Sequence, residues 1–348
     1  MSPQDLKKSA LLMMAIVICV MGAWEFYLRS TGFELGFDDG GPLWAYHRAR
    51  VSEPVDHATV FIGSSRIKFD LDIETWESIT GEKAIQLSCV GSTPRPLLFD
   101  LANDQSFNGK LIVDVTEGLF FSTSPRNFVR PDEGLKYYND ITPTQKASFY
   151  LNQPLESTFV FLDKEAFSLN AMLDKLEIPS RHGVVMAPIF ARDFGRTKFN
   201  RQDFLGKPFM ADTNQQRHQQ EIWSLFARIN RNPPVSGPPL DSMMMSVKEA
   251  TAKIKARGGH VVFVRTPSSG PYLAGEMKNF PREKYWDRLL IETDCRGIHF
   301  QDYPQISRYQ CPEWSHLSPA DAIDFTKHFI DILNTDYGWE FPNTKNLN

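Results

Sequence analysis

Residues 59–66 read TVFIGSSR, a short apolar run that ends abruptly in a glycine and two serines. Short apolar runs bounded by turn residues are typical of buried parallel strands. The same pattern recurs at residues 84–90 (AIQLSCV), 110–115 (KLIVDV) and 260–265 (HVVFVR), and more weakly at 297–301. The sequence therefore predicts five strands in one parallel sheet.

Helical patterns separate these strands. A helix is predicted over residues 94–105, where a proline stands near the first turn and the leucines share one face. Another is predicted over 247–257 and is ended by two glycines. Ser318 is expected to cap a last helix that runs to about residue 333. Strands that alternate with helices predict an α/β fold, which we interpret as a flavodoxin-like three-layer α/β/α arrangement.

Two other stretches set the domain boundaries. Residues 30–57 are interpreted as a connector, and residues 120–241 as a large insertion between the third and fourth strands, because they contain many Phe, Pro, Asn and Arg residues but no clean run of strands. The α/β core is accordingly assigned to residues 58–119 and 242–335. A short tail over 336–348 completes the chain.

The N-terminal residues 1–29 predict a membrane anchor. Lys7 and Lys8 precede an apolar run from Ala10 to Trp24, and aromatic residues extend this run beyond Glu25. The extended run is just long enough to cross a bilayer core of about 30 Å, and the preceding lysines predict that the N-terminus stays inside. We expect a single pass through the inner (cytoplasmic) membrane with the remaining chain in the periplasm. A cleaved signal peptide and a buried core helix are the alternatives.

Composition narrows the function further. The chain of 348 residues is 42% hydrophobic and 23% charged, which is typical of packed globular proteins. Its net charge of −4 provides no basic footprint for a nucleic acid. Cys295 and Cys311 are either a disulfide of an oxidising compartment or two buried thiols, and Cys89 is expected in the core. No spacing of Cys and His residues suggests a metal site, and we expect neither a metal nor another cofactor.

Polar residues follow the strands at the edge where parallel sheets bind ligands. A serine nucleophile needs a base within hydrogen-bond reach and an acidic group that orients the base. Ser64 or Ser65 after the first strand is the candidate nucleophile, His316 the base and Glu313 the orienting acid. The backbone N–H of Gly91, after the second strand, is a candidate donor to an oxyanion.

Three arginines fall near the same edge of the sheet. Arg66, Arg95 and Arg265 are predicted to form a clamp for an anionic glycan or a phosphate group. The alternative is structural pairing with the nearby carboxylates, which are Asp70, Asp114 and Glu117.

Together these motifs resemble the SGNH (GDSL-like) hydrolases. The shared features are a strand followed by Gly-x-Ser, a glycine-containing loop after the second strand, and acid-x-x-His-Leu before the last helix. The resemblance implies that Ser65 is the nucleophile, with Gly63 two positions before it, and that His316 and Glu313 complete the triad. It further implies that the backbone amides of Ser65 and Gly91 hold the oxyanion.

The resemblance covers residues 58–118 and 256–334 and has two departures. The family usually has Asp where Glu313 stands, although serine triads with Glu exist. The family also has a Gly-x-Asn-Asp block after the third strand, where this chain reads VTEG at 115–118. Loss of one oxyanion donor costs roughly 3–4 kcal/mol in comparable enzymes.

Membrane-anchored domains of this kind resemble proteins that add or remove acyl groups on envelope polysaccharides. Some, such as the alginate O-acetyltransferases and the teichoic-acid D-alanylation protein, work beside a membrane-bound O-acyltransferase. The resemblance implies an esterase or O-acyltransferase acting on an envelope polysaccharide or its precursor with such a partner, and aromatic residues of the insertion are expected to form the acceptor groove. One alternative is a degenerate SGNH fold that serves as a glycan-binding or assembly subunit. Another is an unrelated carbohydrate-binding protein, in which Ser65 and His316 would lie far apart.

Overall fold

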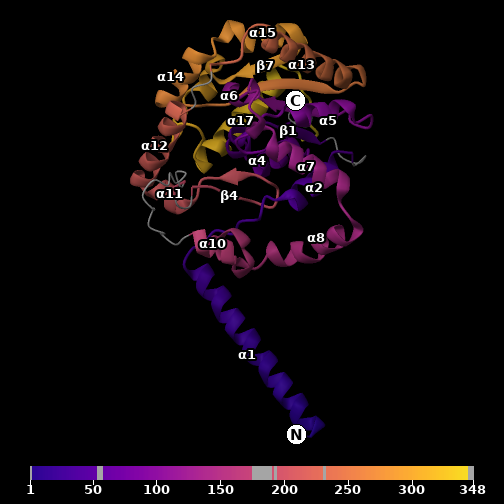
Figure 1. The fold of residues 1–348 in the computed structure, drawn as a ribbon, viewed down its shortest axis with the longest axis vertical. Helices are drawn as coiled ribbons and strands as arrows, with labels where there is room; N and C mark the ends of the chain where they lie inside the picture. The colour runs from indigo at the N-terminus through magenta and orange to yellow at the C-terminus, as the bar shows by residue number, and fades with distance from the viewer. Residues whose placement is uncertain (1, 53–57, 175–189, 192–193, 230–232, 344–348) are drawn as a thin grey trace. The chain divides into compact units, whose positions relative to one another are not determined.

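The structure, a computed structural model, describes residues 2–52, 58–174, 190–191, 194–229 and 233–343 (Figure 1). The end of the predicted connector, parts of the predicted insertion and the last residues of the predicted tail lie outside the described residues.

The chain divides into two compact units. One unit consists of Met1–Asp38 and Thr142–Met186, and the other of Asp39–Ile141 and Ala187–Asn348. The predicted insertion over 120–241 is therefore divided, because its middle belongs to the unit of the N-terminal helix and its two ends belong to the unit of the sheet.

An all-parallel sheet of five strands forms the centre of the second unit. The strand order is β2-β1-β3-β6-β7. Every predicted strand is present, although the second, predicted over 84–90, ends at Gln86. The strands are β1 (Thr59–Ile62), β2 (Ala84–Gln86), β3 (Lys110–Asp114), β6 (His260–Arg265) and β7 (Arg296–His299).

The strands are buried on both sides, which explains their apolar runs. Successive residues of a strand point to opposite sides of the sheet. Val60 and Ile62 of β1 join one hydrophobic cluster, whereas Phe61 between them joins another. Strands β3 and β6 repeat this alternation. Both clusters are covered by helices, so a strand with a polar face would leave polar groups in the interior.

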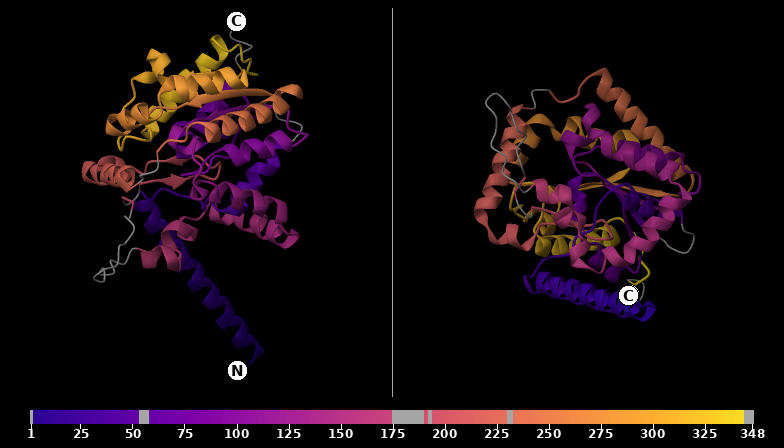
Figure 2. Two further views of the ribbon diagram at one scale, coloured as in Figure 1. Left: turned by 45° about the horizontal axis from the view of Figure 1, so that its top comes forward. Right: turned by 60° about the horizontal axis from the view of Figure 1, so that its bottom comes forward.

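The first cluster contains leucines of the helix predicted over 94–105 and aliphatic residues of the helix predicted over 247–257. The helix predicted over 247–257 begins earlier than expected, because Gly237 at φ 62° turns the chain and Pro238 starts the helix. The helices of this side are α2 (Gly41–Ala49), α5 (Arg95–Asn103), α6 (Glu117–Phe120), α7 (Val129–Asp140), α13 (Pro238–Ala256) and α15 (Trp286–Thr293) (Figure 2).

The second cluster is covered by the helix that follows β1 and by the C-terminal helix. Ile67, Trp76 and Phe325 are buried there. The elements of this side are α3 (Ser65–Asp70), α4 (Ile73–Thr80), α14 (Gly270–Asn279), η5 (Phe300–Asp302), α16 (Pro304–Ser307) and α17 (Pro319–Thr335). Short 3₁₀ turns complete the unit at η1 (Arg50–Ser52), η2 (Pro125–Asn127) and η4 (Arg282–Lys284).

A small subdomain from the end of the predicted insertion packs against α3. It contains the antiparallel hairpin β4 (Arg196–Thr197) and β5 (Asp203–Phe204), followed by α11 (Lys207–Ala211) and α12 (Thr213–Ile229). Phe69 of α3 is buried in its apolar cluster. Lys68 of α3 also forms buried ion pairs with Asp39 at 2.6 Å and Asp203 at 2.7 Å. Apolar and charged contacts therefore both join this subdomain to α3.

The first unit contains the N-terminal helix α1 (Pro3–Ser30), which is long and apolar enough to cross a membrane. Leu28 is its only buried residue within the described chain, so the alternative of a buried core helix is wrong. The same unit contains α8 (Pro143–Glu156), η3 (Val160–Leu162), α9 (Lys164–Phe167) and α10 (Leu169–Asp174). The choice between an anchor and a cleaved signal peptide stays open.

The cysteines of the second unit are buried free thiols. Cys295 belongs to the hydrophobic cluster on one side of the sheet, and Cys311 to the cluster on the other side. Since the sheet separates them, the structure contains the two buried thiols and not the disulfide. Cys89 is in the core, as predicted.

Candidate active site

Three side chains predicted from the sequence meet at the carboxyl edge of the sheet. Ser65 is the first residue of α3, directly after β1, while Glu313 and His316 lie in the loop before α17. The Nε2 atom of His316 lies 2.9 Å from the Oγ atom of Ser65. The Nδ1 atom of His316 lies 2.9 Å from the Oε1 atom of Glu313. The arrangement is that of nucleophile, base and acid in a serine triad.

Gly63 allows the chain to turn into α3 close to the sheet. A Cβ atom at this position would lie 2.5 Å from the Cβ atom of Asp114 and 2.6 Å from the Cγ2 atom of Ile67. Such distances are shorter than van der Waals contact, so a side chain here would displace the start of α3 and Ser65 with it. Packing, and not backbone freedom, therefore requires glycine two positions before Ser65.

The structure distinguishes the two adjacent serines. Ser64 is 1% exposed, and its Oγ atom lies 3.1 Å from Asp114 Oδ2 and 2.7 Å from Thr116 Oγ1. It also caps α3 by accepting the N–H of Arg66. Ser65 is partly exposed, and its hydroxyl contacts His316. Ser64 is thus a structural residue, and Ser65 is the serine that a substrate can reach.

Glu313 is fully buried and accepts hydrogen bonds on both carboxylate oxygens. Its Oε1 atom accepts the backbone N–H groups of His316 at 2.6 Å and Ser315 at 3.3 Å, besides facing the imidazole. Its Oε2 atom accepts the indole N–H of Trp223, which lies on α12. An acceptor-only group facing Nδ1 keeps the proton on that nitrogen, which leaves Nε2 free to accept the proton of Ser65.

Aromatic rings enclose the imidazole. The ring centre of His316 lies 4.4 Å from that of Phe69, 5.8 Å from that of Phe194 and 6.4 Å from that of Trp223. Phe194 and Trp223 come from the end of the predicted insertion, so this segment builds one wall of the site. The rings exclude water from His316, which is buried. A hydrogen bond between charged or polar groups is stronger in such surroundings than in water.

The loop after β2 runs beside the start of α3. The N–H of Cys89 donates to the carbonyl of Gly63 at 3.2 Å, and Gly91 follows two residues later. Gly91 is exposed and has φ 63°, which is the left-handed conformation that glycine adopts without strain. The hydroxyl of Ser92 donates to the carbonyl of Val90 and so holds the peptide that carries the N–H of Gly91.

Two backbone N–H groups are available at this edge. Ser65 is the first residue of α3, where an N–H has no acceptor within the helix. Within the described ranges, neither this N–H nor that of Gly91 donates a hydrogen bond. In the block VTEG at 115–118, the resemblance places the family's Asn donor at Glu117, whose carboxylate accepts hydrogen bonds from Arg265 at 2.9 Å and 3.0 Å. Two donors are therefore free, and the third position is occupied by an internal contact.

The structure does not bring the three predicted arginines together as an exposed clamp. Arg66 and Arg265 are each 1% exposed, and both pair with Glu276 of α14, Arg265 at 2.6 Å. Arg265 also pairs with Glu117 at 2.9 Å, which was one of the predicted structural alternatives. Burial by itself would raise the pKa of Glu276, but Arg265 and Arg66 outweigh burial and hold this pKa below its usual value. Both arginine charges are thus compensated inside the protein.

Arg95 differs from the other two arginines. Its guanidinium donates to the hydroxyl of Thr93 at 3.2 Å and to the carbonyl of Ser122, and it lies over the ring of Phe128. No carboxylate pairs with it in the described part of the chain. Burial lowers the pKa of Arg95 to about 10. Of the three predicted arginines, Arg95 is the one without a carboxylate partner in the described chain, although it is buried like the other two.

Asp70, the last residue of α3, contacts the loop that carries His316. Its Oδ1 atom accepts the N–H of Leu317 at 2.9 Å, while its Oδ2 atom has no partner among the residues described. Burial raises the pKa of Asp70 well above its usual value. The folded protein therefore keeps a proton that the unfolded chain loses above about pH 4, and the free energy of unfolding falls as the pH rises from there toward the raised pKa.

We expect Asp70→Asn to remove this pH-dependent loss. The neutral amide imitates the protonated carboxyl, so the variant should match the wild type near pH 4 and exceed it by roughly 1 kcal/mol or more at pH 7. Denaturation of the full-length protein at both pH values measures this difference. The partly exposed Asp324, whose pKa is lowered mainly by Tyr309, is the control, because Asp324→Asn should change stability with pH in the opposite direction. A difference for Asp70→Asn that does not change with pH would contradict the prediction.

Sequence reasoning missed two residues of this region. Trp223 and Glu276 lie far along the chain from Glu313 and Arg66, the residues that they contact. The Gly-Pro pair at 270–271 marks the start of α14, so the helix that carries Glu276 could have been predicted, although its partners could not. Nothing near Trp223 in the sequence indicates that its indole faces a carboxylate.

Comparison with known proteins adds no identification: no family model matches the chain, and no curated protein is found to be similar to it.

Proposed function

We propose that the protein is a serine O-acyl esterase or acyltransferase of the SGNH type that acts on an envelope glycan. The observation that carries the proposal is the continuous chain of hydrogen bonds from Ser65 through His316 to Glu313. Ser65 and His316 are one hydrogen bond apart, whereas an unrelated carbohydrate-binding fold would have no reason to align them. The strand order, counted within the parallel sheet as 2-1-3-4-5, supports a flavodoxin-like three-layer arrangement.

The proposed reaction proceeds in two acyl-transfer steps. His316 Nε2 takes the proton of Ser65 as its Oγ atom attacks the acyl carbonyl, and the N–H groups of Ser65 and Gly91 donate to the developing oxyanion. The bond to the leaving oxygen then breaks, and this oxygen receives the proton from His316. In the second step His316 deprotonates a sugar hydroxyl or water, which attacks the acyl-enzyme; the bond to Ser65 Oγ breaks, and this oxygen takes the proton back from His316.

An aromatic rim favours a glycan or an acyl chain as the bound group. Phe190 and Phe226 are exposed, and their ring centres lie 5.6 Å and 6.0 Å from that of Trp223, which itself faces His316. Sugar rings and acyl chains both pack on exposed aromatic faces. Arg95 would contribute a positive charge for an anionic polysaccharide. We propose that the domain works outside the inner membrane, in the periplasm, beside a membrane-bound O-acyltransferase that supplies the acyl group.

One observation favours a second candidate function. Glu117, at the position of the family's third oxyanion donor, has a carboxylate that accepts hydrogen bonds from Arg265, so this position contributes no donor to a substrate. A site with a weakened oxyanion hole could bind a glycan without turning it over. The second candidate is therefore a non-catalytic glycan-binding or assembly subunit of the SGNH fold.

A fluorophosphonate probe separates the two candidates, since it modifies only serines that a base activates. We expect the full-length wild type to be labelled and Ser65→Ala to lose all labelling. Ser64→Ala is the matched control, because Ser64 is adjacent but buried, and it should keep its labelling. A folded wild type that resists the probe would favour the binding subunit, and labelling that survives in Ser65→Ala would contradict the assigned nucleophile.

Trp223→Phe tests the link between the insertion and the triad. Phenylalanine keeps the aromatic wall but removes the N–H that Glu313 accepts, so we expect the rate of probe labelling to fall about tenfold, as for the loss of one hydrogen bond to a charged group. Phe194→Leu, which alters the same wall without touching Glu313, is expected to have a smaller effect. An unchanged rate in Trp223→Phe would show that the carboxylate needs no support from α12.

A further inference from the structure

The segment that follows Thr142 exposes an unusual number of large apolar side chains. In the first unit, Leu151 on α8 and Leu169 on α10 are both 73% exposed. The exposed apolar group of this segment consists of Tyr150, Leu151, Leu155, Leu169, Met172 and Leu173. Water-soluble surfaces rarely concentrate so many apolar residues in so short a segment, and such concentrations mark contact with a protein or a membrane.

This apolar group is attached to the end of the membrane-spanning candidate α1. Glu25 accepts the N–H groups of Val160 and Phe161 at 3.1 Å and 3.2 Å, which lie in η3 between α8 and α9. Arg29 donates to the carbonyl of Thr158. These contacts come immediately after the apolar run of α1, so they hold the segment at the level where α1 would leave the bilayer.

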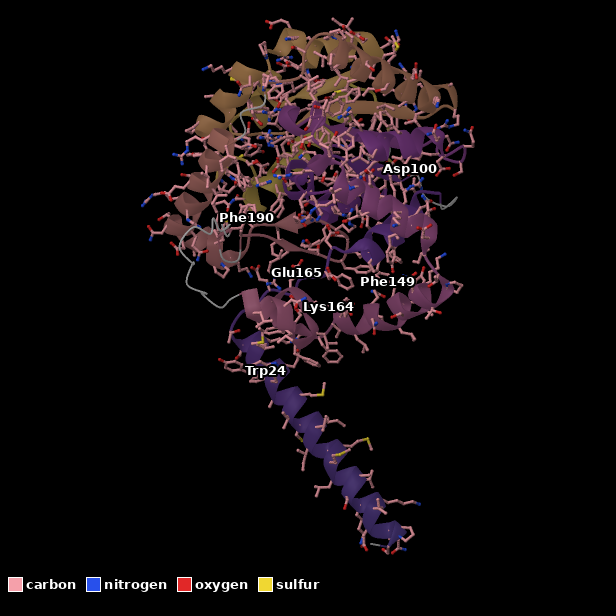
Figure 3. The ribbon with its side chains drawn as sticks, in the orientation of Figure 1. Trp24, Asp100, Phe149, Lys164, Glu165 and Phe190 are labelled. Atoms are coloured by element: carbon pink, nitrogen blue, oxygen red, sulfur yellow. The ribbon has the colours of Figure 1, made fainter. Side chains whose placement is uncertain are left out.

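Aromatic residues of α1 mark the same level. Trp24 and Tyr27 are exposed and stacked, with ring centres 5.7 Å apart. Trp and Tyr collect at membrane–water interfaces because one part of each ring system is apolar and the other hydrogen-bonds with water. Trp24 lies in the part of α1 next to the segment that carries Lys164 and Glu165 (Figure 3).

We propose that α8, η3, α9 and α10 form an interfacial collar that lies on the lipid surface where α1 leaves the membrane. The exposed apolar group inserts among the lipid headgroups and the upper acyl chains, as in other helices that lie in the membrane plane. The proposal rests on α1 spanning the bilayer and not on the chemistry of Ser65. The bilayer is favoured over a protein partner because the collar continues directly from the surface that α1 itself presents to lipid.

The charges of the collar predict which lipids it recognises. Two lysines, Lys146 and Lys164, are outnumbered by the acidic residues of the segment, which are Glu156, Asp163, Glu165 and Asp174. An excess of negative charge gives no attraction to anionic lipid, which basic segments recognise. Binding should therefore depend on apolar insertion, work in neutral phosphatidylcholine and change little with salt.

Labelled cysteines in the full-length protein test the collar. In a Cys19→Ala background, which removes the exposed native thiol, Leu151→Cys or Leu169→Cys would carry an environment-sensitive fluorophore. Ile291→Cys on α15 is the matched control, because Ile291 is an apolar residue that is 79% exposed and belongs to the other unit. The proteins would be placed in phosphatidylcholine nanodiscs with and without nitroxide-labelled lipid.

We expect nitroxide lipid to reduce fluorescence about twofold or more at positions 151 and 169 and hardly at all at 291, as for side chains about 5–10 Å deep in the interface. Replacing part of the lipid by phosphatidylglycerol should leave this result unchanged. Quenching at 151 and 169 no stronger than at 291 would overturn the proposal. Fluorophores shielded from water but not quenched by lipid would also overturn it, since a protein would then cover the segment.

Discussion

Replacing His316 by alanine is expected to lower ester turnover by about 10⁴-fold or more, in line with the loss of the base in other serine triads. His316 is the only group described within hydrogen-bond distance of Ser65 Oγ, so no neighbour can take over the proton. The measurement is the turnover of a chromogenic acetyl ester by full-length protein, with binding followed separately. Because His316 is enclosed by aromatic rings, its removal should leave a cavity, and thermal unfolding must confirm that the variant is folded.

Glu313→Gln is expected to reduce turnover by about 10⁴-fold as well, although it is nearly isosteric. The carboxylate accepts N–H donors on both oxygens, from the His316 loop on one side and from Trp223 on the other. An amide has a single acceptor oxygen, so its NH₂ group must face either the imidazole or the indole. If the amide oxygen faces His316, its NH₂ group opposes the indole N–H of Trp223; if the oxygen faces Trp223, the NH₂ group opposes Nδ1 and disturbs the tautomer of His316.

A double-mutant cycle identifies this cause. In Glu313→Gln combined with Trp223→Phe, the indole donor is absent, and the amide can turn its oxygen to His316 without a clash. We expect the double variant to be more active than Glu313→Gln alone. Effects that simply add would contradict the geometry described here, because residues in contact should couple. Turnover by His316→Ala close to that of the wild type would refute the proposed chemistry as a whole.

The second large effect concerns stability. Glu276→Ala is expected to lower the free energy of unfolding by about 3–5 kcal/mol, the usual result of leaving a buried charge without its partner. Glu276 is the shared partner of Arg66 and Arg265, and without it two buried guanidinium groups face the single carboxylate of Glu117. Denaturant-induced unfolding of the full-length protein measures the change.

Two controls separate buried charge from lost packing. Arg308→Ala removes an ion pair with Asp324 whose side chains are both exposed, and it should lower the free energy of unfolding far less than Glu276→Ala does. Arg66→Met combined with Glu276→Leu removes one charge of each sign and should recover most of the stability lost in Glu276→Ala. A double variant as unstable as Glu276→Ala would show that the network stabilises through shape and not through charge compensation.

The same network also contacts the proposed active site. Arg66 follows Ser65 directly, and its Nε atom donates to the hydroxyl of Ser315 in the histidine loop at 3.4 Å. The arginine that was predicted to hold a substrate therefore joins the two segments that carry the triad. The position of Arg66 after a strand is compatible with substrate binding and with structural pairing. Its ion pair with Glu276 favours the structural role.

Local pattern was sufficient for the sheet and for the triad. Runs such as VFI at 60–62 are apolar at every position because both sides of their strand are buried, so consecutive residues of the sequence indicate this burial. Ser65 and His316 could be paired in advance because residues that follow parallel strands or precede the last helix meet at one edge. The sheet follows from periodicity and chain order, whereas the choice of Ser65 over Ser64 follows only from the resemblance to the SGNH hydrolases.

Tertiary structure alone decided which polar groups have hydrogen-bond or ion-pair partners inside the protein. The sequence by itself determined a parallel α/β sheet, an apolar N-terminal helix, and the identity of Ser65, His316 and Glu313 as candidates. It did not determine that Ser64 is tied to Asp114, that Trp223 supports Glu313, or that Arg66 is neutralised by Glu276 while Arg95 is not. Each of these contacts joins residues distant along the chain, and hydrogen bonds and ion pairs act only over a few ångströms. Their partners are therefore set by packing, for which the sequence contains no local signal.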